Sequence, residues 1–76
     1  DELLNISGIS ASFVLYPSGD QVMISARSIG SCNVQMVLEP LGGGGNAATA
    51  GAQLRGKAVR DVLSELVASI DKFYES

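Results

Sequence analysis

The sequence predicts a small α+β fold with the order strand, strand, helix, strand, helix. Two segments near the N-terminus, residues 9–16 and 21–27, alternate apolar and polar side chains, which is typical of half-buried strands. Residues 57–74 instead repeat apolar side chains every three or four positions, which is typical of a helix with one buried face. This order indicates the α+β class, and we expect a small mixed sheet, with a hairpin, on which the helices pack.

The first two strands should form a hairpin. The link between them, residues 17–20, has the sequence Pro-Ser-Gly-Asp, in which proline fixes φ and Gly19 can adopt a positive φ. A link this short joins only antiparallel neighbours. On the second strand, Val22, Ile24 and Ala26 share one face, while Met23, Ser25 and Arg27 share the other.

A short helix should follow the hairpin. Apolar residues recur there at helical spacing, at Val34, Val37, Leu38 and Leu41. Ser31 or Asn33 can cap its first turn with a side-chain oxygen. Pro40 disfavours helical geometry at Glu39, so we expect the helix to end there. A third strand should then occupy residues 47–54, which are small and mostly apolar, although alanine also suits helices.

Composition limits what the chain can do. The 76 residues carry a net charge of −3, so the chain lacks the basic surface that displaces counterions from nucleic acid. There is no histidine to act as an acid, a base or a zinc ligand. The single cysteine, Cys32, can form neither an internal disulfide nor a thiolate cluster. We therefore expect one domain over residues 1–76, with no catalytic centre, cofactor or membrane contact of its own. Because the sequence starts at Asp1 without a methionine, we expect it to be a piece excised from a larger protein.

The glycine run is the first candidate site for a ligand. Successive glycines can present backbone N–H groups that form a concave, anion-binding nest. The run consists of Gly42, Gly43, Gly44 and Gly45, and Asn46 follows it. The alternative is a linker without a ligand, but linkers usually mix glycine with serine and other polar residues, whereas this run is bracketed by Leu41 and small residues.

The end of the second strand is the second candidate. Ser25 and Arg27 alternate onto one face, and Ser28 follows them. Arginine matches phosphate well through its planar, two-pronged donors. Asn33 and the first N–H groups of the short helix could complete an anion site there. The alternative is a surface arginine that ends a strand.

Taken together, these segments resemble a known domain. ISARS, Asn33-Val34-Gln35, LGGGGN and AGAQL are similar to the type 1 DHH-associated domain, which is the C-terminal partner of the catalytic domain in DHH-family phosphoesterases. The resemblance covers nearly the whole chain, and it is strongest to the GdpP type of bacterial cyclic-di-AMP phosphodiesterase. That family has a histidine after the glycines, where this sequence has Asn46, which can donate and accept hydrogen bonds but cannot carry a proton.

The resemblance implies that catalysis and substrate binding belong to different domains of the parent protein. Two Mn²⁺ ions would lie in a separate DHH domain of the parent protein and activate water for attack on phosphorus. This chain would bind the phosphate and base of a cyclic dinucleotide or a short oligonucleotide across the cleft between the domains. The family also implies a cytoplasmic location, with the parent anchored to the membrane by an N-terminal segment outside this chain. Two alternatives remain open: a nucleic-acid-binding module related to the C-terminal domains of RecJ-type exonucleases, and a purely structural domain.

Overall fold

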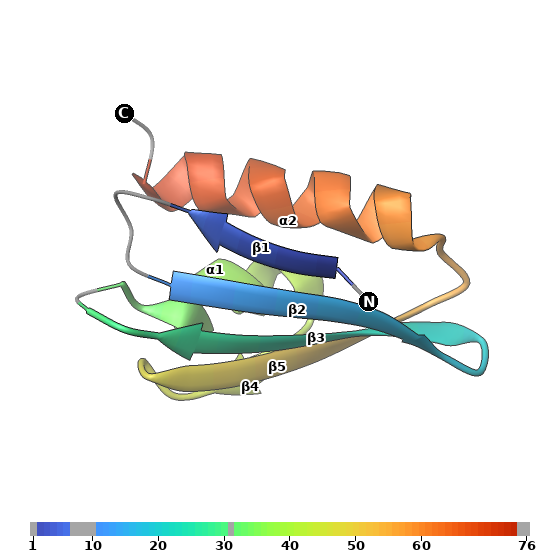
Figure 1. Ribbon diagram of the computed structural model, residues 1–76, viewed down its shortest axis with the longest axis horizontal. Helices are drawn as coiled ribbons and strands as arrows, with labels where there is room; N and C mark the ends of the chain where they lie inside the picture. Colours follow the sequence, from blue (N-terminus) through green and yellow to red (C-terminus); the bar gives the residue numbers. More distant parts are fainter. Residues whose placement is uncertain (1, 7–10, 31, 75–76) are drawn as a thin grey trace.

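The computed structural model describes residues 2–6, 11–30 and 32–74. They form the strands β1 (Glu2–Ile6), β2 (Ala11–Ser18), β3 (Gln21–Ser28), β4 (Gly44–Gly45) and β5 (Thr49–Arg55), the helices α1 (Val34–Leu38) and α2 (Val59–Tyr74), and the 3-10 helix η1 (Glu39–Leu41). The strands make one sheet in the order β1-β2-β3-β5-β4 (Figure 1). The predicted α+β class, the hairpin and the long C-terminal helix are therefore confirmed.

The sheet is antiparallel at every pairing among the described residues, and not mixed as we expected. The reason lies in the connection through α1. β4, the first strand after α1, runs in the same direction as β3, but β5 lies between these two strands. The chain reverses after β4 and places β5 antiparallel to both of its neighbours.

Two strands were not predicted, and two others are shifted: β5 spans Thr49–Arg55, where we expected a strand over residues 47–54. β1 pairs with β2, and β4 is a pair of glycines alongside β5. Residues 9 and 10 of the predicted first strand lie outside the described part of the chain, and β2 is described from Ala11 through Pro17 to Ser18. The pairing of β1 with β2 is described only as far as Leu15. On that side Pro17 has no described partner strand, so the backbone N–H that proline lacks is not needed there for a hydrogen bond between strands.

The core lies between one face of the sheet and the two helices. The buried residues are Ala11, Phe13 and Leu15 of β2; Val22, Ile24 and Ala26 of β3; Ala50, Ala52 and Leu54 of β5; Val34, Val37 and Leu38 of α1; Val62, Leu66 and Ile70 of α2; and Cys32. α1 packs against β5 and α2, and α2 packs against β2 (Figure 1). The Oγ of the buried Ser69 on α2 donates a 2.5 Å hydrogen bond to the carbonyl of Val37 on α1.

The other face of the sheet carries the residues that alternate with the buried ones. They are Ser12, Val14 and Tyr16 of β2; Met23, Ser25 and Arg27 of β3; and Thr49, Gly51 and Gln53 of β5. These residues are exposed or half-buried, and we call this surface the open face. None of the helices described is long and apolar enough to cross a membrane.

Candidate functional site

The candidate site lies on the open face. Ser25 and Arg27 are both exposed on β3, and the alternation predicted for this strand placed them on one face. Ser25 pairs with Gly51 of β5, and Gly51 in turn pairs with Gly44 of β4. Arg27 pairs with Thr49 in the neighbouring row. The register thus brings the serine, the arginine and the middle of the glycine run onto the same sheet surface.

The first two glycines of the run end the preceding 3-10 helix. Gly42 has a φ of 84°, a left-handed conformation that favours glycine. Its N–H donates to the carbonyl of Glu39 at 3.0 Å, and the N–H of Gly43 donates to the carbonyl of Leu38 at 2.9 Å. Both N–H groups therefore satisfy carbonyls at the helix end. Contrary to the expected nest, these two groups already have backbone acceptors.

Packing and backbone geometry exclude a side chain at some glycines of the run but not at all of them. A Cβ at Gly43 would lie 2.5 Å from the carbonyl oxygen of Gly51, and one at Gly45 would lie 2.6 Å from the Cα of Ala50, so both positions need glycine to let the loop approach β5. A Cβ at Gly44 would meet nothing within 4 Å. Gly44 is also exposed, and its φ is not positive. Gly44 is thus the one glycine of the run that neither packing nor backbone geometry requires.

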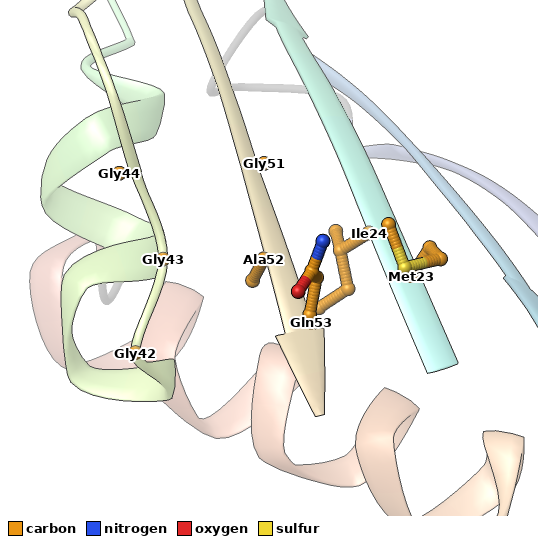
Figure 2. A pocket seen from close by; sticks show the side chains of 8 residues that line it. All are labelled: Met23, Ile24, Gly42, Gly43, Gly44, Gly51, Ala52 and Gln53. Atoms are coloured by element: carbon orange, nitrogen blue, oxygen red, sulfur yellow. The ribbon is translucent and has the colours of Figure 1, made fainter. Parts of the chain in front are cut away.

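A pocket of about 340 Å³ lies over these glycines, which is within the size range of small-molecule sites. Its lining consists of Met23, Ile24, Gly42, Gly43, Gly44, Gly51, Ala52 and Gln53. Figure 2 shows the glycine run on one side of β5 and Met23 on the other, with Gln53 on β5 between them. Since Met23, Gly51 and Gln53 belong to the open face, the pocket opens there.

A second hollow of about 250 Å³ adjoins it on the same face. It is lined by Ser12, Val14, Ser25, Ala26 and Arg27. Among the described residues that line the two hollows, Arg27 is the only charged one. Because Ser25 of the second hollow pairs with Gly51 of the first, a ligand with an anionic end and an uncharged end could occupy both.

Ser28 stabilises the loop after β3 through hydrogen bonds to Gly30. Its Oγ donates to the carbonyl of Gly30 at 3.0 Å and accepts from the N–H of the same residue at 3.3 Å. The backbone N–H of Ser28 donates to the carbonyl of Ala48 at 2.8 Å. Ser28 does not line either hollow.

Asn33 caps α1, as the sequence predicted. Its Oδ1 accepts from the N–H of Met36 at 3.1 Å, and the N–H of Val34 donates to the carbonyl of Ala47 at 3.1 Å. Two of the N–H groups in the first turn of α1 are therefore used within the chain. The anion site that we expected to form from Asn33 and this helix end does not have those two donors.

Asn46, the residue that follows the glycine run, closes a turn. Its Oδ1 accepts from the N–H groups of Ala48 and Thr49, both at 2.9 Å, and its own N–H donates to the carbonyl of Thr49 at 2.7 Å. This is the local bonding that makes asparagine a good turn residue. Only the side-chain N–H₂ of Asn46 is left for the ligand contact that we expected.

The sequence reasoning missed five residues that line the pocket, and two of them, Met23 and Gln53, have side chains on the open face; the others are Ile24, Gly51 and Ala52. The signal was present for Met23, because it alternates onto the same face as Ser25 and Arg27. Gln53 follows the same alternation on β5, two residues after Gly51. Neither residue type by itself indicates a ligand, and the pairing of β5 with β3 that brings them together could not be seen in the sequence.

Within residues 11–30 and 32–73, whose side chains the structure describes, no three His, Cys, Asp or Glu residues are grouped so that they could hold a metal ion. The described residues therefore do not fit the pair of Mn²⁺ ions that the resemblance implies, and those ions would need ligands from another domain.

Known proteins match the chain over its whole length. The model of the DHHA1 domain matches residues 1–76. The chain is 46% identical to the cyclic-di-AMP phosphodiesterase GdpP of Geobacillus thermodenitrificans (strain NG80-2), 43% to GdpP of Bacillus subtilis (strain 168), and 38% to the cyclic-di-AMP phosphodiesterase PdeA of Listeria monocytogenes serotype 1/2a (strain 10403S). Each match covers 99% of this chain but only 12% of the relative.

Proposed function

The chain belongs to the DHHA1 domain family, and we propose that it is the substrate-recognition domain of a DHH-family phosphodiesterase that hydrolyses cyclic-di-AMP or short oligonucleotides. The observation that carries this proposal is the row formed by Ser25, Gly51 and Gly44 on the open face, with Arg27 in the adjacent row. The relatives' names supply the substrate class, and the chain spans only about an eighth of their length.

In this proposal Arg27 holds a phosphate of the substrate. Its guanidinium is exposed on the open face and can form two parallel, charge-assisted hydrogen bonds to phosphate oxygens. Ser25, on the same strand, can add a hydroxyl donor. The glycine floor beside Ser25 leaves room for the uncharged part of the nucleotide in the neighbouring pocket. Binding of this kind orients the phosphodiester but does not cleave it.

Cleavage is assigned to the parent's DHH domain. When bound there, two Mn²⁺ ions would supply an activated water and stabilise charge on the phosphate. The open face of this chain would then cover the substrate from the opposite side, so the DHH domain is the expected protein partner. The cytoplasmic location stays a prediction.

Replacement of Arg27 in the full-length protein tests the proposal. Arg27→Ala should lower kcat/KM for cyclic-di-AMP by more than tenfold, because a substrate phosphate would lose its charged partner. Arg27→Lys should restore part of the loss, since lysine keeps the charge without the two-pronged geometry. Arg60→Ala, an exposed arginine on α2, is the matched control. Unchanged kinetics for Arg27→Ala, with cyclic-di-AMP and with dinucleotides alike, would rule out this placement of the phosphate.

A further inference from the structure

The pocket beside the glycines is lined at one end by the side-chain amide of Gln53. Gln53 is exposed on β5 and lies directly opposite Met23 of β3 (Figure 2). An amide of this type carries an acceptor oxygen and a donor N–H₂ side by side. Among the residues that the structure describes, the Gln53 side chain has no hydrogen-bond partner. It can therefore present both groups to a ligand in the pocket.

The floor of the pocket is flat where Gln53 adjoins it. Gly51, two residues before Gln53, has no side chain, and neither does its partner Gly44. A planar ring can therefore approach the backbone of β5 and β4 closely. Met23 flanks this floor with a polarisable thioether, which makes favourable contacts with aromatic rings. The combination of a flat floor, a thioether wall and a free amide suits a nucleobase.

The positions of Gln53 and Arg27 fit the two ends of one nucleotide. Gln53 lies in the row of Met23, and Ser25 and Arg27 follow along β3 in the next two rows of the open face. Alternate residues of a strand are about 7 Å apart, so the first and last of these rows are separated by about 13 Å. Both side chains are long enough to shorten that distance. A nucleotide can thus place its base near Gln53 and its phosphate near Arg27.

We propose that Gln53 reads the base of the substrate, and that it selects a purine edge with a donor next to an acceptor, as adenine presents. This inference rests on the proposed function, because it assigns the base-reading residue of the same site. Glutamine forms two hydrogen bonds with the amino group and the neighbouring ring nitrogen of adenine in other recognition sites. A purine that lacks the 6-amino group offers the acceptor alone and forms only one of the two bonds.

The test compares two substrates in the full-length protein. They are cyclic-di-AMP and the analogue in which both bases are purine without the 6-amino group. The natural protein should prefer cyclic-di-AMP by about tenfold in kcat/KM. Gln53→Met, which keeps the length of the side chain but removes the amide, should lower kcat/KM for cyclic-di-AMP by more than about tenfold, because both bonds are lost. It should lower kcat/KM for the analogue less, because only one bond is lost there, so that the preference disappears.

The control is Gln35→Met on α1, whose side-chain amide donates to Glu39 at 3.3 Å and does not line the pocket. It should keep the preference for adenine. If Gln53→Met keeps the preference, or slows both substrates equally, Gln53 does not read the base. Arg27→Ala separates this outcome from failure of the proposed function: it should slow both substrates. If it slows neither, the site of the proposed function, with the substrate phosphate at Arg27, is overturned.

Discussion

Gly44 lies directly opposite Gly51 across β4 and β5, and the exposed hydroxyl of Ser25 follows in the same row. The two glycines leave a stretch of the open face without side chains. A Cβ at Gly51 would lie 3.2 Å from the carbonyl oxygen of Ile24, which is a tight contact with the backbone, whereas one at Gly44 would meet no atom within 4 Å. Packing within the chain therefore disfavours a side chain at Gly51 but not at Gly44, where a bound ligand is the better explanation for glycine.

Gly44→Val should therefore weaken substrate binding without unfolding the domain. Valine suits a strand, and position 44 has neither a positive φ nor a close neighbour that would clash. Its side chain would project over the pocket, so kcat/KM for cyclic-di-AMP should fall by about tenfold or more. The thermal unfolding midpoint should stay close to that of the natural protein. Full activity in this variant would show that the ligand does not lie over Gly44.

The companion variant is Gly43→Ala, one residue earlier in the chain. Its Cβ would lie 2.5 Å from the backbone oxygen of Gly51 and 2.9 Å from the Cβ of Ala52. Overpacking of this kind costs about 1–3 kcal/mol, so this variant should lose stability as well as activity. A stable Gly43→Ala protein would mean that the loop can move away from β5 at little cost.

Ser69→Ala tests the contact between the helices. The hydroxyl is buried and donates to the carbonyl of Val37, which joins α2 to α1 and thereby supports the chain segment that enters the glycine run. Removal of the donor should lower the free energy of unfolding by about 1–3 kcal/mol, because it leaves a buried carbonyl without that partner. Urea denaturation measures the loss, and Ser64→Ala on the exposed side of α2 is the control. Equal stability of the two variants would contradict the prediction.

The sequence was sufficient for the elements whose pattern is local. Alternation placed Ser25 and Arg27 on one face of β3, and the 3.6-residue period identified α2. It was insufficient for β4 and for the glycine run as a whole. Two glycines have no side chains from which a pattern could be read, and they form a strand only because β5 offers them an edge. The hydrogen bonds that occupy Gly42 and Gly43 likewise depend on how η1 ends.

The hydrogen bonds of Asn46 also depend on how the turn folds, so they could not be predicted from the sequence. They are the basis of the last prediction. The sequence led us to expect a side chain that reaches the ligand, but its Oδ1 holds the N–H groups of Ala48 and Thr49. Asn46→Ala would remove both bonds at an exposed turn, where water replaces part of what is lost, so the net cost should be about 1 kcal/mol. We expect faster hydrogen exchange at the amides of Ala48 and Thr49, and a fall in kcat/KM of about tenfold or less. Asn46→Asp keeps the acceptor, so it should restore the exchange protection while its negative charge still weakens substrate binding. If Asn46→Ala abolished turnover while exchange at both amides stayed slow and Arg27→Ala remained active, Asn46 would be the main phosphate contact, and the site centred on Arg27 would be wrong.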